Sequence, residues 1–166
     1  MPAAAIVPAV IMCVFAALLS GLGFWAFTSA PEGSNPRTAL IFTLIPAGIS
    51  ILLAIITLLQ GKAGKLAAAR STVTIAAIVA MLLAGGAGGR IYPAMGGQKR
   101  YAEAKEQWDR SISEKSRPDS PDARKAFFES MDAKDHDTKY LVNALLGITG
   151  ASAAACLLLF ATRPKV

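Results

Sequence analysis

Four long, predominantly apolar runs alternate with polar segments along the chain, at about residues 4–27, 38–59, 70–92 and 140–162. A helix of about 20 apolar residues, rising about 1.5 Å per residue, crosses a hydrocarbon core of about 30 Å. Each of the four runs has this length. The pattern therefore predicts an all-α integral membrane protein in which residues 1–166 form a single four-helix bundle.

Small residues recur at helical spacing in the third and fourth runs. In lipid, rows of this kind allow two helix backbones to approach closely, because hydrophobicity no longer distinguishes a neighbouring helix from the solvent. We therefore expect the third and fourth membrane helices to touch along these rows. The small residues concerned are Ala80, Ala84, Gly85, Gly88 and Gly89 in the third run, and Gly147, Gly150, Ala151 and Ala155 in the fourth.

The long segment at about residues 94–138 contains two amphipathic helix patterns. Residues 98–114 place Tyr101 and Trp108 on one face, and Pro118 ends this pattern. Ser120 then caps a second helix, with Pro121 in its first turn. We expect these two helices to form an extracytoplasmic cap between the third and fourth membrane helices.

Composition and charge placement agree with a membrane location. The chain is 54% hydrophobic and 17% charged, with a mean hydropathy of +0.46, whereas soluble domains carry roughly 25% charged residues. The segment between residues 99 and 139 is electrically balanced, so the net charge of +6 comes from residues beside the apolar runs. Such charge sets topology and contacts anionic lipids, and it does not indicate nucleic-acid binding. The flanking basic residues include Lys62, Lys65, Arg70, Arg163 and Lys165.

Basic clusters without acids mark cytoplasmic segments. The clusters lie in the link between the second and third runs and at the carboxyl end, which four spans place on the same side. We therefore expect both termini in the cytoplasm and residues 94–138 outside, in a bacterial inner membrane or a plasma membrane. Trp25, Tyr92 and Tyr140 lie at the predicted outer ends, as residues of an aromatic belt do.

The order of the spans resembles that of tetraspanins, with short first and second links and a long outer loop before the fourth span. The outer loop lacks the cysteines that define that family, and Cys13 and Cys156 both lie inside apolar runs. The resemblance therefore covers the layout alone and assigns no residue a role. The cysteine positions predict neither a disulfide framework nor a thiolate metal site.

The middle of each apolar run lacks the ionisable groups that proton-coupled transporters and rotary-ring subunits require. A single histidine also argues against a bis-histidine haem, and we expect no metal or cofactor. Polar residues gather instead where the third run ends and the fourth begins. Either they form a pocket for a head group or small ligand, or Asp137 caps the fourth helix and Arg90 extends toward the membrane interface. A further expectation is an ion pair between Arg90 and Asp135 or Asp137. The polar residues concerned are Arg90, Tyr92, Asp135, His136, Asp137 and Asn143.

These observations favour a structural or accessory scaffold subunit of a membrane complex, because the spans carry few polar residues at depth. Its partners would be membrane lipids and either another membrane protein or a second copy of the chain. The alternative is an oligomeric small channel or a carrier of lipids or small molecules. A third interpretation is a small membrane enzyme that acts on lipophilic substrates through Arg90, Tyr92 and His136. A non-enzymatic role is preferred.

Overall fold

The computed structural model describes residues 3–31, 34 and 37–165, and every regular element in this part of the chain is an α-helix. Four of the five helices are long and apolar enough to cross a membrane, which indicates a membrane protein. The all-α class and the four candidate membrane helices predicted from the sequence are therefore confirmed. The helices are α1 (Ala3–Thr28), α2 (Arg37–Lys62), α3 (Leu66–Ser113), α4 (Pro121–Ser130) and α5 (Lys139–Thr162).

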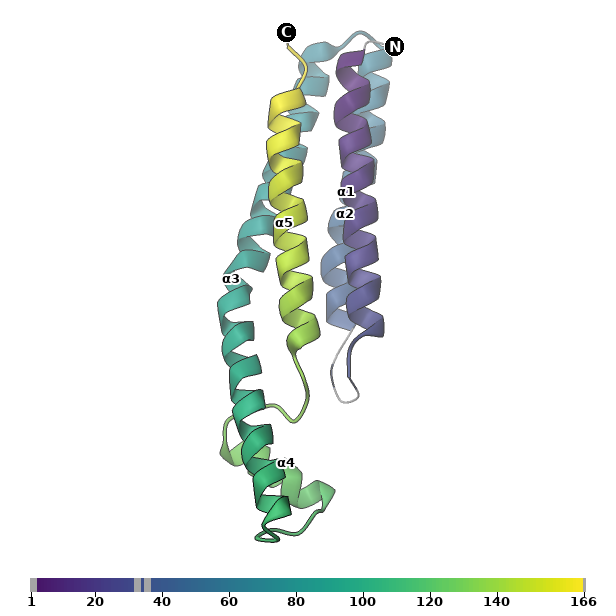
Figure 1. Cartoon of the computed structure of the whole chain (residues 1–166). Coiled ribbons are helices and arrows are strands. Elements are labelled where there is room, and N and C mark those ends of the chain that lie inside the picture. The colour runs from purple at the N-terminus through teal and green to yellow at the C-terminus, as the bar shows by residue number, and fades with distance from the viewer. Residues whose placement is uncertain (1–2, 32–33, 35–36, 166) are drawn as a thin grey trace.

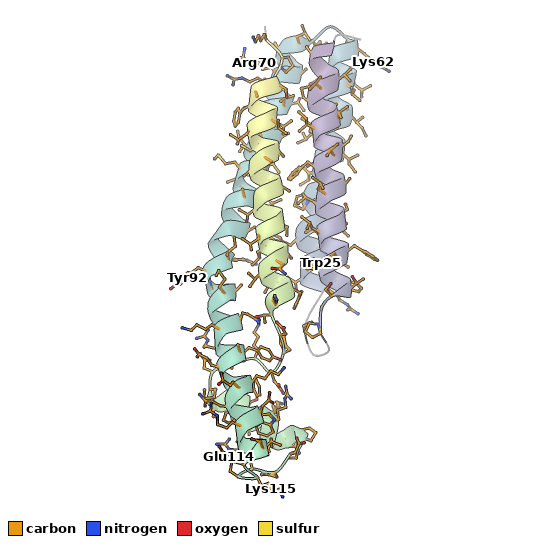
Figure 2. All side chains as sticks on the ribbon, viewed as in Figure 1. Trp25, Lys62, Arg70, Tyr92, Glu114 and Lys115 are labelled. Atoms are coloured by element: carbon orange, nitrogen blue, oxygen red, sulfur yellow. The ribbon has the colours of Figure 1, made fainter. Side chains whose placement is uncertain are left out.

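The four long helices lie side by side as a helical bundle (Figure 1). The main contacts join α1 to α2 and α3 to α5, and further contacts join α1 to α5 and α2 to α3. Helix α1 begins and α5 ends at the same end of the bundle, where Lys62 and Arg70 also lie (Figure 2). The opposite end, at which α1 ends and α2 begins, is called the mouth below.

Helix α2 turns its small residues inward and its large apolar residues outward. Its buried face carries only alanine, glycine and hydroxyl side chains, whereas Ile41, Ile45 and Leu52 are more than half exposed. The buried hydroxyl groups donate to carbonyls one turn earlier, as Thr57 does to Leu53 over 2.8 Å. Lipid covers such an outer face at no cost, while the small inner face allows close helix packing. The buried row is Thr43, Ala47, Ser50, Ala54, Thr57 and Gly61.

Among the glycines, those with the tightest surroundings lie between α1 and α2. A Cβ atom placed on Gly23 would overlap the hydroxyl of Thr43, and one on Gly61 would overlap Ala5. Only glycine fits at these two positions. The α1–α2 contact therefore depends on glycine near both of its ends.

Helices α3 and α5 do pack together, but the glycines expected at this contact are mostly elsewhere. Only Gly88 faces α5, where an added Cβ would lie 3.6 Å from Thr149, and Gly147 faces Leu22 of α1 instead. An added Cβ at Gly85, Gly89 or Gly150 would meet no described atom within 4 Å. The contact uses the alanines, with Ala80 and Ala155 buried and Ala84 and Ala151 partly buried. The three open positions are Gly85, Gly89 and Gly150.

Helix α3 continues without interruption from the bundle into the polar segment, although the sequence pattern predicted a separate helix from residue 98. It has 48 residues, and Pro93 lies inside it. Proline removes one backbone hydrogen bond, a local loss that packing on both sides outweighs. The first half of α3 packs in the bundle, where Ala80 and Ala87 are buried. The second half packs against α4, where Trp108 is buried. At about 1.5 Å per residue the helix is about 72 Å long, more than twice a hydrocarbon core.

Residues 94–138, called the arm below, project beyond the mouth (Figure 1). An aromatic cluster holds α4 against α3, with the rings of Trp108 and Phe127 5.6 Å apart and those of Tyr101 and Phe128 5.9 Å apart. The Ser120 hydroxyl accepts a hydrogen bond from the Ala123 amide, which confirms the predicted helix cap.

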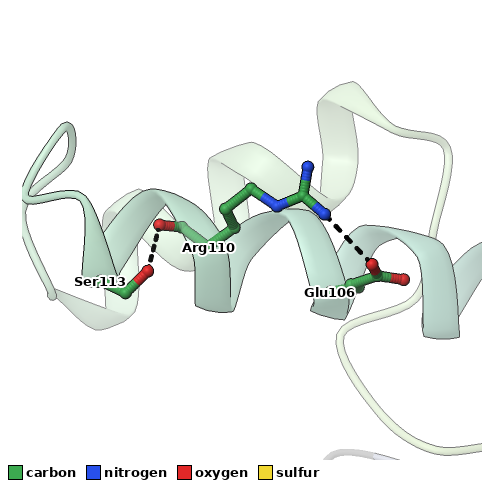
Figure 3. A network of polar contacts seen from close by, with 3 residues as sticks. All are labelled: Glu106, Arg110 and Ser113. Atoms are coloured by element: carbon green, nitrogen blue, oxygen red, sulfur yellow. Dashed lines mark hydrogen bonds and ion pairs between the residues drawn. The ribbon is translucent and has the colours of Figure 1, made fainter.

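The outer surface of the arm carries exposed charge pairs. Arg110 contacts Glu106 over 3.3 Å, and the Ser113 hydroxyl donates to the Arg110 carbonyl over 2.7 Å (Figure 3). The tip of the arm lies near Glu114 and Lys115, at the far end of the molecule from Arg70 (Figure 2). Pairs this exposed contribute roughly 0–1 kcal/mol each, so the aromatic cluster holds the arm together.

Candidate functional site: an amphipathic pocket at the mouth

A pocket of about 850 Å³ lies at the mouth, between the bundle and the base of the arm. Small-molecule sites in proteins typically have about 300–1,000 Å³. All four long helices and α4 contribute to its wall. The pocket exists because α3 runs past the mouth, whereas α1 ends and α2 and α5 begin there, which leaves the ends of these three helices facing the arm.

The wall on the bundle side is apolar. Leu22 of α1, Phe42 of α2 and Leu145 of α5 line it, and Ile148 lies deepest along α5. Tyr140, at the start of α5, also lines the pocket. From Tyr140 to Ile148 the wall extends about 12 Å along the helix axis, at about 1.5 Å per residue. This side can accept an apolar group inserted along the bundle.

The wall on the arm side is charged. Lys125 and Glu129 of α4 line it, together with Lys134 and Asp135 of the segment that leads to α5. Arg124 Nε donates to Asp135 Oδ1 over 2.7 Å, and this contact raises the pKa of Arg124 above its ordinary value. The Asp135 charge is therefore already compensated by its neighbour.

Arg90 joins the two walls. Its guanidinium carbon lies 5.6 Å from the centre of the Phe42 ring, a cation–π geometry that connects α3 to α2. Among the described residues, no carboxylate oxygen lies within 4 Å of Arg90. The ion pair expected between Arg90 and an aspartate is thus not present in this part of the chain, because Asp135 pairs with Arg124 instead.

His136 lines the same pocket and is partly buried. Burial lowers the pKa of His136 below its ordinary value, and the positive charge of Lys134 acts in the same direction, while Asp135 opposes them. Its ordinary pKa is about 6.5, so the imidazole is neutral at pH 7. At this pH the histidine contributes hydrogen-bonding groups to the pocket and no charge.

The other three predicted site residues lie outside the pocket. Tyr92 is 87% exposed and points away from the bundle (Figure 2), because two residues along a helix correspond to about 200° of rotation from Arg90. Asn143 is also exposed. The Asp137 carboxylate accepts a hydrogen bond from the Lys139 amide over 2.7 Å at the start of α5. The structure therefore brings together Arg90, Asp135 and His136 and separates the rest.

Several residues at the mouth were not expected from the sequence. Lys125 and Lys134 belong to an electrically balanced segment, so their charges carried no positional signal. Gln98 was equally inconspicuous, yet its side-chain oxygen accepts hydrogen bonds from the Thr138 amide over 2.9 Å and the Thr138 hydroxyl over 3.1 Å. These bonds attach the start of α5 to α3 beside the pocket. The spacing of Lys125 and Phe128 on one face of α4 was the available signal.

Comparison with known proteins adds no relative: no protein-family model matches the chain, and no curated protein or solved structure matches it significantly. Among the described residues, no group of three or more His, Cys, Asp or Glu side chains is arranged to hold a metal ion.

Proposed function

We propose that this protein is an integral membrane protein that binds an amphiphilic, lipid-like molecule in the pocket at its mouth. The observation that carries the proposal is the two-sided wall, apolar toward the bundle and charged toward the arm. An amphiphile matches both sides at once, whereas a purely polar ligand would leave the partly exposed Leu22 and Phe42 without an apolar partner. Of the expected functions, this one corresponds to the carrier of lipids or small molecules.

Membrane placement supports this proposal. Between Arg70 and Arg90 the chain has no charged residue, and about 30 Å of helix separates them, which equals a hydrocarbon core. Arg90 and Tyr140 would then lie at the membrane boundary. The charged side of the pocket would face the lipid head groups, and Ile148 would lie about two turns deeper, where acyl chains begin.

The orientation belongs to the same proposal, with both termini in the cytoplasm and the arm as an extracytoplasmic cap. It rests on the basic residues at the opposite end of the bundle from the mouth. Single cysteines at Ser116 and Gly64, in a background without Cys13 and Cys156, test it. An impermeant maleimide should label position 116 in intact cells and position 64 only after lysis. The reverse pattern would contradict the orientation.

Reducing the size of the pocket tests the binding function. Ala94 and Ala144 both line it, and phenylalanine at either position would occupy its volume. Native mass spectrometry of protein extracted in mild detergent should show a bound amphiphile in the parent and less of it in Ala94→Phe and Ala144→Phe. Ala153→Phe adds the same ring at an exposed position of α5 outside the pocket and serves as the control. Equal retention in all four proteins would refute the proposal.

A scaffold role is the second candidate, and the projecting arm favours it. Helix α3 carries the aromatic cluster about 20–30 Å beyond the mouth, at about 1.5 Å per residue, where it can reach a neighbouring protein. A photo-reactive residue at the exposed Gln107 should then cross-link to one partner in fixed stoichiometry, while one at Leu157 on the bundle should not. Cross-linking to lipid alone at both positions would argue against a scaffold.

The enzyme interpretation has no comparable support. It required Arg90, Tyr92 and His136 to act together. Tyr92 points away from the pocket that the other two residues line, which favours a binding role over this interpretation.

A further inference from the structure

The charges of the described residues around the pocket do not balance. Arg90, Lys125 and Lys134 are cationic, and Glu129 and Asp135 are anionic. Arg124 adds a fourth positive charge through its pair with Asp135, so the group carries a net charge of +2. His136 leaves this total unchanged at neutral pH.

The three lining cations lack close anionic partners within the described part of the chain. The ion pairs found there join other residues. Of the two carboxylates that line the pocket, Asp135 is paired with Arg124, and Glu129 has no cation within 4 Å among the described residues. Arg90 contacts an aromatic face instead of an acid. All three residues are exposed, so an anion that enters with the ligand can reach each of them, and charge-assisted hydrogen bonds are stronger than neutral ones.

The size of the charge selects the head group. A phosphate monoester carries about −1.5 to −2 charges at pH 7 and three acceptor oxygens. That charge matches the net +2 of the pocket, and the oxygens match three cations that approach from α3, α4 and the segment before α5. A carboxylate offers only one negative charge, and a zwitterionic head group brings a cation of its own.

The apolar side selects the remainder of the ligand. It is a single wall of limited depth, from Phe42 at the mouth to Ile148 on α5, within a volume of about 850 Å³. We propose that the pocket binds a lipid phosphate monoester, with the phosphate between Arg90, Lys125 and Lys134 and one hydrocarbon chain along α5. This inference rests on the proposed amphiphile-binding function and specifies its ligand.

Binding of four ligands that share either the head group or the acyl chain distinguishes recognition of the head group from recognition of the chain. They are a lysophosphatidic acid, a lysophosphatidylcholine and a monoacylglycerol with the same acyl chain, and glycerol phosphate without a chain. Binding is measured on delipidated full-length protein in a neutral detergent, below the concentrations at which the ligands form micelles. We expect lysophosphatidic acid to bind about ten- to a hundredfold tighter than monoacylglycerol, as for hydrogen bonds to charged groups. Added salt should reduce this preference.

Charge variants test the assignment of residues. Arg90→Gln and Lys134→Gln should each reduce the preference for lysophosphatidic acid about tenfold while leaving the affinity for monoacylglycerol within twofold. Lys105→Gln removes the same charge from an exposed position of α3 outside the pocket and should keep the preference of the parent. If one variant fails to fold, the other variant and the salt dependence of the parent still test the phosphate contacts.

The possible failures are distinguishable. No binding of any chain-bearing ligand would overturn the proposed function itself. Equal affinities for lysophosphatidic acid, lysophosphatidylcholine and monoacylglycerol would keep amphiphile binding and overturn phosphate recognition. Equal binding of glycerol phosphate and lysophosphatidic acid would show a site for soluble phosphates and overturn the role of the hydrocarbon chain.

Discussion

Replacing Gly23 by alanine should destabilise the bundle, although alanine is the better helix former. A Cβ at this position would overlap the Thr43 hydroxyl and lie 2.9 Å from the Thr43 Cβ. Restoring an ordinary contact of 3.4 Å to that carbon requires α1 to move away from α2 by about 0.5 Å. Thr43 cannot give way by rotation, because its Cβ is fixed to the backbone and the residue is only 1% exposed.

Two free energies of opposite sign decide the outcome. Alanine in place of glycine stabilises a helix interior by about 1 kcal/mol. Overpacking costs about 1–3 kcal/mol, and a gap of 0.5–1 Å between packed surfaces forfeits about a quarter to a half of their dispersion energy. We therefore expect a net loss of up to about 2 kcal/mol for Gly23→Ala. Gly21→Ala lies two residues earlier, about half a turn away on the other side of α1, with open space beside it, and should be neutral or stabilising by up to about 1 kcal/mol.

Unfolding in mixed micelles of increasing sodium dodecyl sulfate content, followed by circular dichroism, measures both variants. Thr43→Ala removes the overlapping hydroxyl, so Gly23→Ala should cost less in that background, by about 1 kcal/mol. A stability of Gly23→Ala equal to that of Gly21→Ala would refute the close packing of α1 on α2. The same cost in both backgrounds would show that the hydroxyl contributes nothing to the clash and would leave only the Cβ of residue 43, which alanine retains.

Two further predictions concern the junction between the arm and the bundle. Gln98→Ala leaves the amide and hydroxyl of Thr138 without their acceptor and should lower the free energy of unfolding by about 1–3 kcal/mol. The Thr138 amide should then exchange its hydrogen faster. Gln107→Ala, at an exposed position, should change neither quantity. Lowering the pH through about 6.5 should lower the melting temperature of the parent more than that of His136→Gln. The folded state holds the pKa of this histidine below its ordinary value, so the unfolded chain takes up the proton first and stability present above that value is lost on acidification. Equal drops in both proteins would assign the acid sensitivity to another group.

Local patterns predicted the elements well where the deciding interactions are themselves local. The length of the apolar runs predicted the four long helices, and the sequence around Ser120 predicted the start of α4. The same logic failed at Pro93, where a local helix-breaking signal competes with packing far along the chain on both sides. Burial of Ala80 at one end of α3 and of Trp108 at the other keeps the helix continuous.

Helix rotation explains the remaining misses. A membrane helix is apolar on all sides, so its sequence does not reveal which small residue faces which neighbour. The glycines of α3 and α5 are more conspicuous than Gly23 and Gly61, yet the latter two make the closest contacts. The same uncertainty applies at the site, where adjacent polar residues such as Arg90 and Tyr92 point to opposite sides of one helix. The cations of the arm meet Arg90 only through the tertiary fold.

The continuity of α3 makes this helix a mechanical lever with its pivot at the pocket. Arg90 lies beside the pocket, and Ser113 lies about 35 Å further along the same helix, at about 1.5 Å per residue. A rigid helix amplifies angle into distance, so a tilt of about 5° at Arg90 moves the tip near Ser113 by about 3 Å. Since α4 is clamped to that distal half by the aromatic cluster, it travels with the tip. Under the proposed function, an occupant that tilted α3 at the mouth would therefore displace the tip of the arm by this distance.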